Sequence, residues 1–303
     1  MKRPDAKVRA ARVSIYSNTL LTTLKLVAGV ATGSVSVLSE AVHSANDLVA
    51  SFIAFFSVRI SDRPADQRHP YGHGKVESMS GLIEALLIFG AAAYIIVEAV
   101  ERLRGQAEPL RVGPGLAVMV VSAVTNVLVA RYLFRVARQT DSVALLADAE
   151  HLRTDVVTSV GVVVGLALVA LTGLSEIDAI VALVVAAVIC RAAYRLTREA
   201  LEPLMDAGLP EGDLQVVRSV LDAEPGVLAY HKLRTRKSGS SRHVDAHVLM
   251  DDHLSLVEAH ELTERLEDRI RELLPRAEVM LHTEPHDAEV EHQLEFHGRN
   301  IAQ

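Results

Sequence analysis

The chain has 303 residues, half of which are hydrophobic, and a formal net charge of −7. Its mean hydropathy of +0.25 is too apolar for an ordinary soluble protein of this length. The single cysteine, Cys190, excludes an intrachain disulfide and a zinc finger built on cysteines, and the chain lacks the basic footprint of a nucleic-acid-binding protein.

Charge divides the chain into two parts. Up to Pro203 there are 18 acidic and 20 basic residues, whereas from Asp206 onward there are 20 acidic and 11 basic residues, a balance of −9. The sequence predicts that the first part is a transmembrane domain and that the second part is an acidic soluble domain. We expect a cytosolic N-terminal segment (1–12), a transmembrane domain (13–205), a cytosolic domain (206–286) and a polar tail (287–303).

Six apolar segments follow the basic residues 1–12, which we expect to form a partly ordered lead-in. Each segment is near or above the roughly 20 residues that a helix needs to cross a bilayer. They cover residues 13–32, 34–60, 78–103, 112–136, 144–171 and 177–196. Only helices and closed barrels satisfy their backbone groups in lipid, so the sequence predicts a six-helix transmembrane bundle.

Basic residues in the short loops predict the orientation of the bundle. They are frequent at the N-terminus and after the second, fourth and sixth segments, and absent from the first and fifth loops. Both termini are therefore expected in the cytosol. The third loop is an exception, with Arg102, Arg104 and Arg111.

The second and fifth segments carry the same pattern, acid-x-x-His-x-x-x-Asp, 108 residues apart. The copies are Glu40, His43 and Asp47, and Asp148, His151 and Asp155. His and Asp four residues apart share one helix face, so two such helices supply four N/O ligands, a set that suits tetrahedral Zn²⁺. A buried Asp near the membrane centre costs about 2.5–3.5 kcal/mol, which favours a cargo site. The alternative is that these residues are helix ends that face water or neighbouring helices.

The acids one turn before each His leave two interpretations open. Glu40 and Asp148 either orient the imidazoles or face water.

A third candidate group lies in the loop after the second segment, where Asp66, His69 and His73 are spaced by three and four residues. The loop group is either a metal site or part of a solvated cytosolic loop.

Beyond Pro210 the periodicity changes to that of a small α+β domain of order αββαβ. A helix is expected over 211–223, strands over 227–236, 242–250 and 278–284, and a second helix over 255–274. Ser255 and Glu258 form a capping box at the start of that helix. Alternation places Val227, Ala229, His231 and Leu233 on one strand face and His282 with Glu284 on another. Beyond His286 we expect a frayed tail.

These features together resemble the cation diffusion facilitator family, most similarly its bacterial zinc and ferrous-iron efflux branch. The resemblance rests on the six spans, the paired His/Asp motifs, the Gly-His-Gly-Lys-x-Glu-Ser loop at 72–78 and the C-terminal domain. It implies a homodimeric antiporter of the bacterial inner membrane that exports divalent metal in exchange for protons. It also implies a ferredoxin-like or metallochaperone-like cytosolic domain that binds metal across the dimer interface.

The resemblance assigns residues to four sites in this sequence. The transport site maps to His43, Asp47, His151 and Asp155, the loop site to Asp66, His69 and His73, the cytosolic site to His231, His247, His260, His282 and Glu284, and a charged pair at the dimer mouth to Lys75 and Asp206. The branch often has Asp in place of His43, and Asp is common in place of Glu284. A second imidazole favours borderline metals, so Zn²⁺ is the preferred cargo, ahead of Fe²⁺, Cd²⁺, Co²⁺ and Mn²⁺.

Five further histidines are expected to be ordinary surface residues: His243, His253, His286, His292 and His297. Two other function classes remain as alternatives. An intramembrane metalloprotease would normally show His-Glu-x-x-His, but the only His-Glu, at His260-Glu261, has no second His. A membrane-anchored metal sensor would leave the His/Asp pairs within the membrane unexplained.

Overall fold

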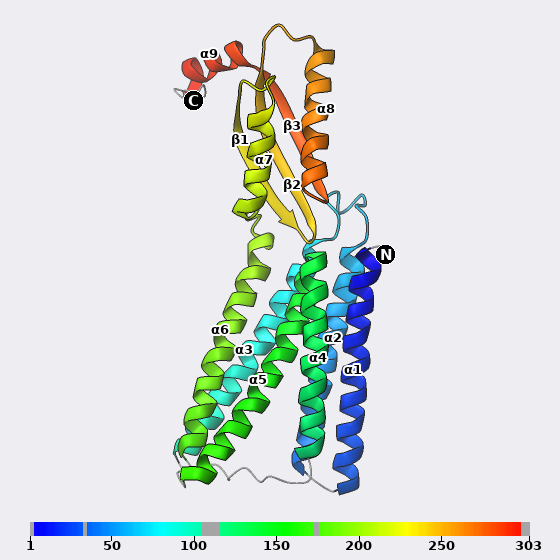
Figure 1. Cartoon of the computed structure of the whole chain (residues 1–303), viewed down its shortest axis with the longest axis vertical. Helices are drawn as coiled ribbons and strands as arrows, with labels where there is room; N and C mark the ends of the chain where they lie inside the picture. Colours follow the sequence, from blue (N-terminus) through cyan, green and yellow to red (C-terminus); the bar gives the residue numbers. More distant parts are fainter. Residues whose placement is uncertain (1–2, 33–34, 105–115, 173–175, 298–303) are drawn as a thin grey trace. The chain divides into compact units, whose positions relative to one another are not determined.

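A computed structural model describes residues 3–32, 35–104, 116–172 and 176–297 (Figure 1). The chain forms two compact units, Met1–Glu202 and Pro203–Gln303. The first is a bundle of long helices and the second a small α+β domain, so the predicted fold class is confirmed.

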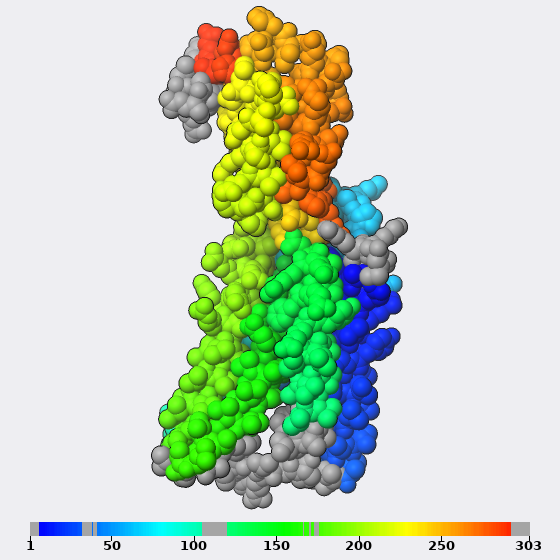
Figure 2. Space-filling model, in the orientation of Figure 1, coloured from blue at the N-terminus to red at the C-terminus, as the bar shows by residue number. Residues whose placement is uncertain are grey.

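The described residues of the first unit form six helices. They are α1 (Arg3–Thr32), α2 (Val35–Ser61), α3 (Lys75–Leu103), α4 (Leu116–Thr140), α5 (Val143–Thr172) and α6 (Glu176–Leu204). By length and hydropathy, five helices of the described residues could cross a membrane, namely α2 to α6. Helix α1 is not among them; it packs against α2 and α4, and Figure 2 shows α1 and α4 side by side.

Helix α1 begins earlier than expected. Residues 1–12 were predicted to be a partly ordered lead-in, but the helix runs from Arg3 without a break. The prediction is wrong because this stretch packs inside the bundle: Ala10 and Ala11 are fully buried, and Lys7 is only 1% exposed. Residues 105–115 lie outside the described part, and with them the predicted start of the fourth segment at 112.

An ion pair joins α3 and α6 at the third loop. Arg102, at the end of α3, pairs with Asp178 in the first turn of α6 and with Glu98 one turn earlier in α3. Two carboxylates beside one guanidinium leave little net positive charge there.

The second unit has the predicted αββαβ order. Its elements are α7 (Glu211–Ala223), β1 (Ala229–Ser238), β2 (Ser241–Met250), α8 (Leu256–Leu273), β3 (Ala277–Pro285) and α9 (His286–His297). The sheet order is β1-β2-β3, with β2 antiparallel to β1 and parallel to β3. The parallel pair is possible because α8 provides the crossover.

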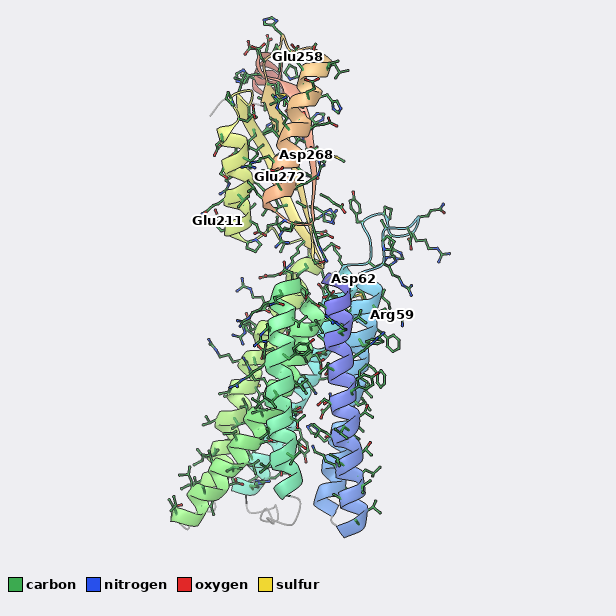
Figure 3. The ribbon with its side chains drawn as sticks, turned by 45° about the vertical axis from the view of Figure 1, so that its right-hand side comes forward. Arg59, Asp62, Glu211, Glu258, Asp268 and Glu272 are labelled. Atoms are coloured by element: carbon green, nitrogen blue, oxygen red, sulfur yellow. The ribbon has the colours of Figure 1, made fainter. Side chains whose placement is uncertain are left out.

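One face of the sheet packs on α7 and α8 around a single apolar core. Val244, Ala246 and Val248 of β2 alternate toward that core, and Leu262 and Leu266 of α8 meet them there. The predicted capping box of α8 is confirmed. Ser255 accepts a hydrogen bond from the Glu258 amide and Glu258 accepts one from the Ser255 amide; Figure 3 labels Glu258 at this end of the helix and Asp268 and Glu272 further along.

A β-bulge in β1 overturns the predicted strand face. His231 pairs with His247, but the next paired residues are Arg234 and Asp245, so β1 contains one extra residue. Lys232 takes up the irregularity with a positive φ of 49°. Leu233 consequently packs on the apolar core, on the opposite side from His231. Simple alternation had placed the two on one face.

The C-terminal tail is also more ordered than expected. Instead of fraying beyond His286, the chain forms α9, of which residues 286–297 are described. The Asp252 carboxylate accepts hydrogen bonds from the backbone amides of Asp287 (2.9 Å) and Ala288 (3.2 Å). These bonds satisfy two of the free N–H groups that a helix leaves at its first turn, which the sequence pattern of the tail did not indicate.

Candidate metal centres

Helices α2 and α5 bring the two predicted His and Asp pairs together. His151 Nε2 lies 3.1 Å from Asp47 Oδ1, which joins the two helices directly. His43 Nε2 lies 3.8 Å from Asp155 Oδ1 and 4.0 Å from Asp47 Oδ1. One ligand atom from each of His43, Asp47 and Asp155 lies within 4.8 Å of the others. The two copies of the sequence pattern therefore form one group, which we call the intramembrane centre.

Three side chains of the intramembrane centre are largely buried. The exposed fractions are 8% for Asp47, 11% for His151 and 17% for Asp155, whereas 51% of His43 is exposed. Asp155 Oδ2 and His151 Nδ1 are buried without a hydrogen-bond partner among the described residues. Buried polar atoms are normally paired, and two imidazoles with two carboxylates form a donor set that Zn²⁺ binds.

The acid that precedes the second pair does not contact its imidazole. Asp148 is 1% exposed, so it does not face water, and it accepts a hydrogen bond from Ser51 Oγ at 3.4 Å. His151 Nδ1, a ring nitrogen that an orienting carboxylate could bind, has no partner in the described part of the chain. The side chain of Glu40 lies outside the described residues.

The loop between α2 and α3 folds its three predicted ligands together. Asp66 lies 3.2 Å from His69 Nδ1 through Oδ1 and 3.4 Å from His73 Nε2 through Oδ2. The imidazole rings are 4.5 Å apart between centroids. Gly72, with a φ of 79°, turns the chain between the two histidines.

Backbone hydrogen bonds hold Asp66 in its charged form. The backbone amide of His69 donates to its carboxylate and lowers the pKa; slight burial opposes this effect, and the Arg68 amide adds to it. His73 is mostly buried, and its Nδ1 has no partner within the described ranges. One preorganised carboxylate and two imidazoles can provide three ligands to a divalent metal.

The pairing register of the strands brings three predicted histidine ligands of the second unit together. His231 pairs with His247 across β1 and β2, and His247 pairs with His282 across β2 and β3, so the three form a row on the sheet face not covered by α7 and α8. Glu284 lies two residues after His282 on the same face. The neighbouring rings are 5.1 Å and 4.7 Å apart between centroids.

Glu284 connects this row of histidines. Its carboxylate lies 2.7 Å from His231 Nε2, 2.6 Å from His247 Nδ1 and 3.6 Å from His282 Nε2. Burial raises its pKa, but the hydrogen bonds from His247 and His231 outweigh burial, and the pKa of Glu284 is lowered overall. His260 is not part of this group within one chain: it is an exposed residue of α8 near Glu264.

His243 was predicted to be a surface residue, but it is only 4% exposed. Its Nδ1 lies 3.2 Å from Glu278 Oε2 in the adjacent strand. Burial, followed by the nearby Arg236 guanidinium, lowers the pKa of His243. Of the other histidines set aside, His253 is exposed and His286 is partly buried beside Asp287.

A buried ion-pair network, which sequence reasoning missed, lies at the two ends of the loop between α2 and α3. Lys7 Nζ lies 2.8 Å from Glu77 Oε1 and 3.4 Å from Asp62 Oδ1, and Figure 3 labels Asp62 just after α2. Ser61 Oγ donates to Glu77 at 2.8 Å, and the Ser142 hydroxyl donates to its other oxygen. Glu77 belongs to the Gly-His-Gly-Lys-x-Glu-Ser stretch, which is the only signal that the sequence gave.

The predicted pair of Lys75 and Asp206 spans the two units, and their pairing stays a prediction. Lys75 is the first residue of α3, and Asp206 follows α6 with a φ of 55°. Within its own unit, Asp206 Oδ1 lies 3.8 Å from Arg236 Nη1.

Comparisons with known proteins cover both units. The family model for the cation efflux transmembrane domain matches residues 11–205, and that for the cation efflux protein cytoplasmic domain matches residues 209–286. The metal-bound C-terminal domain of the CzcD transporter from Thermotoga maritima is 26% identical, with a TM-score of 0.24, and the match covers 25% of this chain and 88% of that domain.

Relatives match over nearly the whole length. The cation-efflux pump FieF of Serratia proteamaculans is 36% identical, and the match covers 91% of this chain and 92% of the relative. An uncharacterized transporter of Synechocystis, sll1263, is 38% identical, with 86% of this chain and 85% of the relative covered. The chain therefore belongs to the cation diffusion facilitator family of cation-efflux transporters.

Proposed function

We propose that this protein is a homodimeric antiporter of the bacterial inner membrane that exports Zn²⁺ from the cytosol in exchange for protons. Both termini lie in the cytosol. His43, Asp47, His151 and Asp155 bind the cargo. The observation that carries the proposal is the intramembrane centre itself: two apolar helices place two imidazoles and two carboxylates within ion-binding distance in a largely buried position.

The chemistry of the ligands supports the choice of cargo and of counter-ion. Zn²⁺ binds neutral imidazole and ionised carboxylate, so protons compete with the metal for the same atoms. A metal bound by His151 Nε2 and Asp47 Oδ1 would replace the hydrogen bond of 3.1 Å that these two atoms share. Histidine titrates at about pH 6.5 in water, close to the pH on either side of the membrane, so alternating exposure to the two sides exchanges metal for protons.

The cytosolic domain has a second role in this proposal. His231, His247, His282 and Glu284 bind Zn²⁺ on the open sheet face, and His260 completes the set from the partner subunit. In each subunit the residues from Asp206 onward carry a charge of −9. Two such domains therefore repel each other until bound cations neutralise part of that charge. Zinc binding therefore draws the two domains together, which we expect to see as a zinc-dependent decrease in spin-label distances across the dimer.

The proposal is tested by zinc uptake into proteoliposomes for Asp47→Ala and Asp155→Ala. Both variants should lose uptake while remaining dimeric. A matched control is Glu101→Gln, an exposed acid of α3, which should transport like the wild type. Normal uptake by Asp47→Ala and Asp155→Ala would contradict the assignment and favour a membrane-anchored sensor; uptake that ignores an imposed pH gradient would contradict proton exchange.

Cargo preference is tested separately by isothermal binding of Zn²⁺, Fe²⁺, Cd²⁺ and Mn²⁺. His43 contributes a borderline nitrogen donor, so wild type should prefer Zn²⁺ and His43→Asp should bind Zn²⁺ less selectively. Equal selectivity of the two proteins would show that His43 does not set the preference.

A further inference from the structure

A pair of carboxyl groups lies buried in the bundle outside the four proposed metal ligands. Glu84 of α3 is 0% exposed, and neither of its oxygens has a hydrogen-bond partner among the described residues. Asp148 of α5 is 1% exposed, and its Oδ2 likewise has no partner in the described chain. The two carboxyl groups interact electrostatically with each other. Two carboxyl groups thus share a buried region with three oxygens unpaired.

The groups around this pair are mostly neutral. Ser51 Oγ donates to Asp148 and is itself 3.0 Å from Ser14 Oγ and 2.7 Å from Asn18 Nδ2. Helix α6 contributes apolar residues such as Ile189 and Ala193 to the core around α3.

Few charged groups act on the pair. The titratable groups that act on Glu84 are Asp148 and His151; those that act on Asp148 include His151 and Asp47. No lysine or arginine is among them. Among the groups named here, all from the described residues, the imidazole of His151 can carry a positive charge, but it already lies 3.1 Å from Asp47.

Two buried carboxylates that repel each other and lack a dedicated cation do not both stay ionised; a bound cation, of which the proton is the smallest, neutralises them. We propose that Glu84 and Asp148 form a binding site for the counter-ion, one proton held between them, next to the intramembrane centre and distinct from the metal ligands. The inference deepens the proposed function and rests on it. A divalent metal entering the centre repels this proton electrostatically, and the proton rebinds when the metal leaves.

Infrared spectroscopy of the purified, metal-free protein in sodium-free buffer at neutral pH tests the bound proton directly. Wild type and the control Glu101→Gln should show the carbonyl stretch of a buried protonated carboxylic acid. This band should be reduced in Glu84→Gln and lost in the double variant Glu84→Gln/Asp148→Asn, which is nearly isosteric with wild type. A band unchanged in the double variant, or absent from wild type, overturns the proposal.

Zinc flux in proteoliposomes tests the role in exchange. Glu84→Gln should keep the wild-type affinity for Zn²⁺ but lose the stimulation of flux by a pH gradient, whereas Glu101→Gln should keep both. Full stimulation in Glu84→Gln, or stimulation of wild type by a sodium gradient in place of a pH gradient, overturns the proposal. If wild type moves no zinc at all, the proposed function fails, and the infrared result still decides whether the pair holds a proton.

Discussion

The strongest stability prediction concerns Lys7→Met. Lys7 is 1% exposed and Glu77 is 0% exposed, and their charged atoms are 2.8 Å apart. Removal of one partner from a buried ion pair costs about 3–5 kcal/mol because the other charge stays buried. Glu77 retains hydroxyl hydrogen bonds from Ser61 and Ser142, so we expect a loss of about 3 kcal/mol, at the lower end of that range.

The loss should be measurable as a thermal shift of the detergent-solubilised protein. With a shift of about 2–4 °C per kcal/mol for a unit of this size, Lys7→Met should lower the melting temperature by about 6–12 °C. The control is Arg12→Met, an exposed residue of the same helix, for which we expect a change within about 0.5 kcal/mol. The double variant Lys7→Met/Glu77→Gln should recover part of the loss, because the uncompensated charge is gone.

The result that would refute this reasoning is a Lys7→Met protein that melts together with Arg12→Met. The same conclusion would follow if the two substitutions were additive, that is, if Glu77→Gln lowered the melting temperature of Lys7→Met by as much as it lowers that of the wild type. Either outcome would mean that the network contributes no coupling between α1 and the helices on each side of the loop that joins α2 and α3.

Three further predictions follow from single contacts. Ser255→Ala removes the capping box of α8 and should cost about 1 kcal/mol, seen as faster hydrogen exchange in its first turn. The pKa of Glu284 is lowered, so its ionised form stabilises the folded domain above the unfolded pKa of about 4.3, and this stabilisation is lost as pH falls through the folded pKa. With a chelator present, Glu284→Gln should therefore show a smaller decrease in unfolding free energy at acid pH than the wild type. Gly161→Val should cost about 1–3 kcal/mol, because a Cβ there would lie 2.4 Å from a side chain of α6, whereas Gly90→Ala, which meets open space, should not.

Periodicity was sufficient to pair each His of the intramembrane centre with the Asp on its own helix. A spacing of four residues places His43 with Asp47, and His151 with Asp155, on single helix faces wherever the helices begin or end. The exact ends of α2 and α5 therefore did not matter for that prediction.

What sequence reasoning missed depends on contacts between distant segments. Lys7 stands among other basic residues, and nothing local distinguishes it from an exposed lead-in; only the positions of Asp62 and Glu77 make it a buried partner. His243 is buried in the context of neighbouring strands, beside Glu278, which lies 35 residues later in the chain. Such residues acquire their roles only when the elements are assembled.

The bulge in β1 lets a single strand meet two opposite requirements. Its hydrophobic residues must reach the helices, and one imidazole must reach Glu284 on the other side; strict alternation does not allow both for His231 and Leu233. Deletion of Lys232 would restore regular alternation in β1. Either His231 would then turn away from Glu284, or Leu233 would turn away from the apolar core. In the proposed cytosolic site, metal binding therefore depends on strand length as much as on residue identity, so a relative that keeps all the histidines but lacks the inserted residue should bind zinc here through one donor fewer.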